Sequence, residues 1–173
     1  NVGSLSPSQE QLSSLLEHYQ NGQFSEAEKL AISLTQQFPA HQFGWKVLGA
    51  VFSQTGNQLE ARHAKETAVQ LAPQDAEAHY NLGNTLKELG RFEESEESYT
   101  QAIALKSDYA EAHNNLGMTL EELGRLDEAE ASYTQVIVLK PDFSEAHNNL
   151  GVTLHALGRL DEAEASYTQA TVL

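Results

Sequence analysis

The chain has 173 residues, with 25 acidic and 10 basic side chains and a formal net charge of −15. It contains no cysteine, which excludes disulfide scaffolds, thiolate metal sites and cysteine nucleophiles. The acidic balance argues against nucleic-acid binding, which needs clustered Lys and Arg, and no apolar run reaches the about 20 residues of a membrane span.

Residues 1–7 are predicted to form an N-terminal tail. The chain begins with Asn1 rather than Met, so we expect a fragment or a processed chain. The tail has neither the basic stretch nor the long apolar stretch of a signal peptide. Together with the lack of cysteine, this favours the cytoplasm.

From residue 8 onward the sequence repeats with a period of 34. The segment from Ala110 matches the one from Ser144 at 24 of 30 positions, and the segment from Ala76 matches the one from Ala110 at 23 of 34. Such a period is typical of solenoids. Counting repeat positions from the first residue of each copy, the repeats are 8–41, 42–75, 76–109, 110–143 and 144–173, and the last is truncated.

Each repeat is predicted to contain a helix, a short turn and a second helix. Glycine recurs at position 15, where Gly124 would end the first helix, and proline at position 32, where Pro141 would stop the second. Asp127 follows the turn, at the positive end of the second helix dipole. Glycine also recurs inside the first helix at position 8, as Gly117, which predicts a close helix contact. We expect the alanine at position 20, such as Ala129, to face it.

These signals resemble the tetratricopeptide repeat (TPR) family. The residues that carry the resemblance include Leu116–Gly117, Ala129, Tyr133 and Pro141. The sequence motif Asn-Asn-Leu-Gly is similar to motifs in the repeat arrays of O-linked N-acetylglucosamine transferases and related bacterial TPR proteins. One departure is position 4, where Trp45 is followed by histidine in the next three repeats. The resemblance implies an all-α fold: a right-handed α-solenoid (TPR superhelix) of antiparallel helix pairs, with the first helices on the concave wall.

No catalytic, cofactor or metal site is predicted, and we expect the chain not to be an enzyme. His79, His113 and His147 share one repeat position, so they should lie about 10 Å apart, too far to bind one zinc ion. We interpret them as packing residues. The tyrosines at position 24, such as Tyr133, are interpreted as core.

The resemblance also implies that first-helix positions 2, 5, 6, 9, 12 and 13 line a peptide-binding face. In the last three repeats these positions carry six glutamates and one lysine, a net charge of −5, so a basic or neutral polar protein or peptide is the expected partner. Position 6 is asparagine in three successive repeats, and a carboxamide can pair with both backbone groups of an extended peptide. The predicted concave-face residues are Glu77, Tyr80, Asn81, Asn84, Lys87, Glu111, Asn114, Asn115, Met118, Glu145, Asn148, Asn149 and Val152.

A second binding mode of the family, a clamp for C-terminal carboxylates, is incomplete in this chain. Lys46 and Asn81 fit it, but Ala50 and Glu111 replace an asparagine and a lysine. We therefore predict weak or no binding to carboxylate tails.

The sequence thus predicts a protein–protein interaction scaffold that binds an extended peptide or a partner domain in an acidic, Asn-lined groove. Two alternatives stay open. One is a substrate-recruiting arm of a larger transferase. The other is an end-to-end self-assembling repeat module, because the chain ends at the apolar Val172–Leu173 without a polar capping helix, which predicts self-association through the last helix pair.

Overall fold

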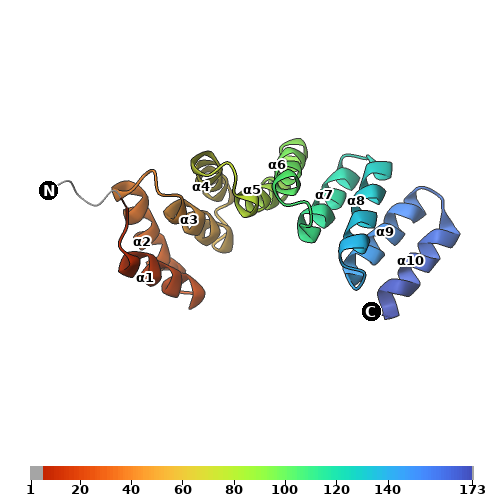
Figure 1. Ribbon diagram of the computed structural model, residues 1–173, viewed down its shortest axis with the longest axis horizontal. Coiled ribbons are helices and arrows are strands. Elements are labelled where there is room, and N and C mark those ends of the chain that lie inside the picture. The colour runs from red at the N-terminus through yellow and green to blue at the C-terminus, as the bar shows by residue number, and fades with distance from the viewer. Residues whose placement is uncertain (1–5, 173) are drawn as a thin grey trace. The chain divides into compact units, whose positions relative to one another are not determined.

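The computed structural model describes residues 6–172, so residues 1–5 of the tail predicted at 1–7, together with Leu173, lie outside the described residues. Within 6–172 the chain forms ten α-helices and no strand, as the all-α prediction requires (Figure 1). The helices are α1 (Gln9–Gln20), α2 (Phe24–Gln37), α3 (Gln42–Gln54), α4 (Gln58–Leu71), α5 (Ala76–Glu88), α6 (Phe92–Leu105), α7 (Ala110–Glu122), α8 (Leu126–Leu139), α9 (Ser144–Ala156) and α10 (Leu160–Val172). None of these helices is long and apolar enough to cross a bilayer.

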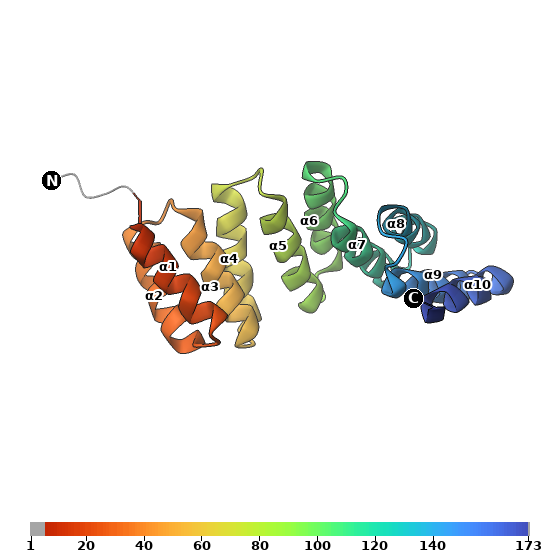
Figure 2. The same cartoon turned by 60° about the horizontal axis from the view of Figure 1, so that its bottom comes forward.

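The helices belong to two compact units. The first unit extends to Leu89 and contains α1–α5, and the second begins at Gly90 and contains α6–α10. Within each unit, consecutive helices pack against each other. In addition, α1 contacts α3 and α7 contacts α9. Figure 2 shows α1 to α4 of the first unit side by side. Stacking of this kind lets each helix pair bury an apolar face that it cannot bury alone.

A glycine with positive φ closes the turn between the helices of a pair. In the second unit, Gly124 has φ of 73°, a conformation that costs glycine little because it has no Cβ. Its N–H donates to the carbonyl of Glu121 at 2.9 Å, and the N–H of Arg125 donates to the carbonyl of Leu120 at 2.9 Å. These bonds satisfy carbonyls at the end of α7. The other turn glycines with positive φ are Gly22, Gly56, Gly90 and Gly158.

The side chain at position 4 bonds four of the first helices, α3, α5, α7 and α9, to the loop that precedes each of them. Trp45 Nε1 donates to the Pro39 carbonyl at 2.9 Å, and His147 Nε2 lies 2.9 Å from the Pro141 carbonyl. A carbonyl only accepts, so the histidine Nε2 is the donor. His79 and His113 make the same bond to Pro73 and Ser107. These three histidines therefore stabilise the loops between repeats through hydrogen bonds. The described residues contain no group of three His, Asp or Glu side chains that could hold a metal ion.

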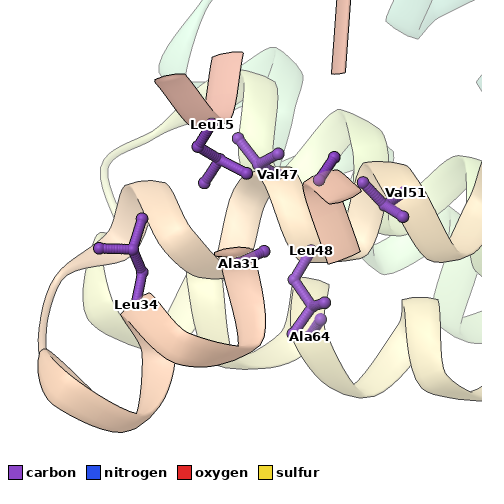
Figure 3. Close-up of a cluster of buried hydrophobic side chains, with 8 residues drawn as sticks. Leu15, Ala31, Leu34, Val47, Leu48, Val51 and Ala64 are labelled. Carbon is purple, nitrogen blue, oxygen red and sulfur yellow. The ribbon is translucent and has the colours of Figure 1, made fainter. Parts of the chain in front are cut away.

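Each unit has its own apolar core. In the first unit, Leu15 of α1, Ala31 of α2 and Val51 of α3 are fully buried (Figure 3). In the second unit, Tyr133 and Val136 of α8 are fully buried. The interpretation of the position-24 tyrosine as a core residue is therefore confirmed for Tyr133.

The close contact predicted at position 8 is present, but it involves a different residue from the one expected. A Cβ added to Gly117 would lie 2.6 Å from Tyr133 Cε1, and one added to Gly151 would lie 2.6 Å from Tyr167 Cε1. The residue nearest to these two glycines is thus at position 24 rather than at the expected position 20. At Gly49 the expected alanine is also close, since an added Cβ would lie 3.5 Å from the Ala61 carbonyl oxygen. Helical side chains lean toward the N-terminus, so the longer tyrosine reaches back over the glycine from one turn further along.

Candidate functional site

The first unit contains a cavity of about 480 Å³. Helices α1, α3, α4 and α5 all contribute to it, and two of the predicted binding residues, Glu77 and Asn81, lie in its wall. Aromatic and apolar side chains form much of the remainder. Its lining comprises Leu16, Tyr19, Phe43, Lys46, Val47, Ala50, Ser53, Gln54, Lys65, Glu77, Ala78 and Asn81.

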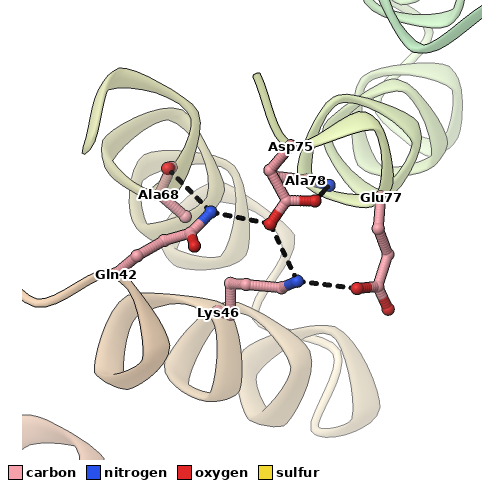
Figure 4. Close-up of polar contacts among 6 residues, drawn as sticks. All are labelled: Gln42, Lys46, Ala68, Asp75, Glu77 and Ala78. Atoms are coloured by element: carbon pink, nitrogen blue, oxygen red, sulfur yellow. Dashed lines mark hydrogen bonds and ion pairs between the residues drawn. The ribbon is translucent and has the colours of Figure 1, made fainter. Parts of the chain in front are cut away.

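A polar network crosses one side of this cavity (Figure 4). Lys46 Nζ lies 2.6 Å from Glu77 Oε2 and 3.0 Å from Asp75 Oδ2. Asp75 is also the N-cap of α5, because its Oδ1 accepts from the Ala78 N–H at 3.1 Å, and its Oδ2 accepts from Gln42 at 2.9 Å. Burial opposes the charge on Lys46 and on Asp75, but these bonds outweigh it, so the pKa of Lys46 is raised and that of Asp75 is lowered.

This pairing changes the charge that the cavity presents. Glu77 was predicted to add negative charge to the binding face, but its carboxylate is bonded to the Lys46 ammonium. Another predicted acidic residue, Glu111, is paired with a lysine in the second unit. Lys140 Nζ lies 2.5 Å from Glu111 Oε1, and this bond lowers the pKa of Glu111. Two of the predicted acidic residues therefore carry their own counter-ions.

Lys65 of α4 is a cavity residue that the sequence analysis missed. Its Nζ donates to Ser53 Oγ at 2.7 Å and to Thr85 Oγ1 at 2.6 Å. Burial lowers the pKa of Lys65 to about 8, and Glu88 only partly opposes this shift. The signal that could have found it is its repeat position, 24, which holds tyrosine in the three repeats that follow.

The second unit contains the corresponding arrangement with different chemistry. Tyr133 Oη, at position 24, donates to Glu121 Oε2 at 2.8 Å. Thr153 Oγ1 donates to Glu121 Oε1 at 2.6 Å. Burial and the carboxylate of Glu121 raise the pKa of Tyr133 above its ordinary range, so the phenol stays protonated as the donor. Repeat positions 24, 12 and 10 thus hold Tyr, Glu and Thr in this unit, where the first unit holds Lys, Ser and Thr.

The structure brings three predicted asparagine and glutamate residues together in the second unit. Asn114 is buried, and its Nδ2 donates to Glu145 Oε1 at 3.1 Å. Asn149 Nδ2 donates to Asn114 Oδ1 at 3.3 Å. Asn114 therefore links α7 to α9, while the carboxamide oxygen and second N–H of Asn149 are not used in this bond.

Another cavity, of about 450 Å³, lies at the last helix pair. Glu145 and Asn148 of α9 line it together with Tyr167 of α10. Val152, further along α9, is 47% exposed. Of the other predicted residues, Tyr80, Asn84 and Lys87 lie on α5, and Asn115 and Met118 lie on α7.

Comparison with known proteins agrees with this architecture. The sequence profile of the tetratricopeptide repeat matches residues 80–142 and 117–172. No curated protein sequence matches the chain. Among solved structures, MamA is 26% identical over 90% of this chain and 91% of its own, with a TM-score of 0.87. A MamA fragment from Desulfovibrio magneticus RS-1 is 16% identical over 100% of this chain and 97% of its own, with a TM-score of 0.90. YrrB, described as a TPR protein with an unusual peptide-binding site, is 21% identical over 92% of this chain and 82% of its own, with a TM-score of 0.83.

Proposed function

Because the chain belongs to the tetratricopeptide repeat family, we propose that it is a protein–protein interaction scaffold whose first helices bind an extended peptide. One observation carries this proposal. The cavity of the first unit is lined by the first helices α1, α3 and α5, and two of the predicted binding residues, Glu77 and Asn81, lie in its wall. A cavity lined by several first helices suits an extended ligand that crosses them. The peptide-binding site named for YrrB supports the same kind of ligand.

The proposed chemistry is recognition of peptide backbone by carboxamides. Asn81 lines the cavity of the first unit, and Asn149 of the second unit has an acceptor and a donor beyond its bond to Asn114. Backbone pairing of this kind tolerates many side-chain sequences in the partner. For the second unit we propose a basic or neutral polar peptide, because Glu145 receives only a neutral amide donor from Asn114.

Replacing Asn81, Asn115 and Asn149 together with alanine is expected to weaken binding of a peptide selected from a random display library. Three neutral hydrogen bonds contribute about 1–3 kcal/mol in total. The measurement is titration calorimetry with the selected peptide. The matched control replaces Gln36, Gln70 and Gln169, which are exposed carboxamides of the second helices, and should leave affinity unchanged. Equal affinity of the asparagine variant and the wild type would reject the carboxamide mechanism.

Self-association through the last helix pair is a second proposal. On α10, Leu160 is 58% exposed and Val172 is 76% exposed. We expect light scattering to show a mass that rises with concentration, and Leu160→Glu to abolish the rise by placing a charge in the contact. A constant monomer mass at high concentration contradicts this proposal and leaves peptide binding unaffected.

A further inference from the structure

We propose that the cavity of the first unit binds an acidic side chain, aspartate or glutamate flanked by apolar residues within a peptide, with Lys65 as its counter-ion. This inference rests on the proposed peptide-binding function and adds the chemistry of one ligand side chain. It reverses, for this cavity alone, the basic or neutral partner expected from the net charge of −5 on the predicted binding positions.

The first argument is that none of the described carboxylates is bonded to Lys65. Its partly buried ammonium is bonded to two hydroxyls, those of Ser53 and Thr85, and the charge of Glu88 offsets only part of the burial. A hydroxyl offers a dipole but no charge, so the cost of desolvating the ammonium is only partly offset. A carboxylate that entered the cavity would supply the missing charge. The other cation of the cavity, Lys46, is already paired with Asp75 and Glu77, so Lys65 is the group that an anion would meet.

The second argument comes from the equivalent positions of the second unit. There the network contains its own anion, because Glu121 accepts from both Tyr133 and Thr153. At the same repeat positions the first unit has Lys65 in place of the tyrosine and Ser53 in place of the glutamate. The formal charge of the pair changes from −1 to +1. The carboxylate that accepts both bonds in the second unit thus has no counterpart at the same positions of the first unit, where Lys65 lies in the wall of an open cavity and Glu88 offsets only part of its burial.

The cavity wall defines what surrounds the carboxylate. Leu16, Phe43 and Val47 give it an apolar lining, and Leu16 is 39% exposed, so apolar neighbours of the acidic residue have a surface to cover. The acidic group is a side chain rather than a chain end for a specific reason. Lys46, the second amine in the described lining, is already paired with Glu77, which would repel a terminal carboxylate, and the neighbouring Ala50 offers no polar side chain to hold one.

The test compares three small peptides on the full chain. Acetyl-Leu-Glu-Leu-amide carries the acidic side chain, acetyl-Leu-Gln-Leu-amide is its neutral counterpart, and acetyl-Leu-Leu has a free terminal carboxylate. Titrations followed by NMR at the Lys65 side-chain methylenes are expected to show saturable shifts with the glutamate peptide. Its affinity should exceed that of the glutamine peptide by at least about ten-fold, because a bond between charged groups is the stronger kind. The free dipeptide should bind no better than the glutamine peptide.

Variants assign the effect to one amine. Lys65→Met keeps the length of the side chain and should remove the preference for glutamate, followed through the backbone amides of α3 and α4. Lys65→Arg retains the charge and should keep part of the preference, which separates a charge effect from a folding defect. Lys29→Met changes an exposed lysine of α2 outside the cavity and should have no effect.

Three results would overturn the inference: equal affinity for the glutamate and glutamine peptides, no saturable shift with any peptide, or a preference that survives Lys65→Met. Tightest binding by the free dipeptide would overturn the choice of a side chain. These outcomes are separable from the function proposed above. If a library-selected peptide depends on the three asparagines but is indifferent to Lys65→Met, the scaffold function stands and only this inference fails.

Discussion

Gly117→Ala is expected to lower the free energy of unfolding by about 2 kcal/mol, although alanine is the better helix former by about 1 kcal/mol. The new Cβ would lie 2.6 Å from Cε1 of Tyr133, a ring that is fully buried. The ring would have to shift, which costs about 1–3 kcal/mol for overpacking and also strains the bond of Tyr133 Oη to Glu121. Chemical denaturation followed by circular dichroism measures the change.

Gly151→Ala is the matched control for that substitution. Its Cβ would come equally close, 2.6 Å, to Cε1 of Tyr167, but this ring is only partly buried and can swing outward. We expect a loss of about 1 kcal/mol or less. A Gly117→Ala protein as stable as the wild type would show that the contact between α7 and α8 relaxes freely, contrary to the packing described above.

The free energy of unfolding is expected to rise by about 1 kcal/mol between pH 7 and pH 9 because of Lys65. Burial holds the pKa of this lysine at about 8 in the folded chain, against 10.5 when unfolded. Between these two values the unfolded state binds more protons, so stability rises with pH through this window. Above about pH 10 the raised pKa of Tyr133 acts in the opposite direction, because there the folded state binds more protons.

Denaturation of wild-type and Lys65→Met proteins at several pH values tests this linkage. The variant should lose the rise between pH 7 and pH 9, whereas Lys29→Met, which removes an exposed amine, should retain it. The negative charge of Glu88 partly compensates the effect of burial on the Lys65 pKa and so limits the size of this rise. Identical pH profiles for wild type and Lys65→Met would contradict the burial of the charged amine.

Local signals were sufficient to predict the helices. Gly124 and Pro141 mark helix ends through backbone conformation, which depends on few neighbours, and the predicted helix–turn–helix pattern agrees with α7 and α8. The contact at Gly117 was predicted, but the prediction did not include Tyr133, which lies nearest to it. Repeat spacing shows that a glycine needs a close neighbour, whereas the identity of that neighbour depends on the direction in which a tyrosine side chain leans.

The candidate site was harder to predict because charge depends on pairing across repeats. Glu77 and Glu111 were counted as free negative charges, but each meets a lysine that is about 30 residues away in sequence. Asn114 was expected on the binding face and is instead buried as a link to α9. Lys65 was overlooked because the sequence analysis considered position 24 only in the three repeats that have tyrosine there, whereas the second repeat has a lysine at this position.

The two forms of the network at positions 24 and 12 constrain any attempt to average the repeats into an idealised array. Tyrosine goes with glutamate in one copy and lysine with serine in another, as Tyr133–Glu121 and Lys65–Ser53 show. A composite repeat in which each position (each column of the aligned repeats) is chosen separately could combine a residue of one pair with a residue of the other. Lysine at position 24 with glutamate at position 12 would form an ion pair within the repeat. Tyrosine at position 24 with serine at position 12 would leave both positions without a charge. A designed copy based on either form should therefore take both columns from the same repeat, and the proposed attraction for an anion belongs to the form with lysine and serine.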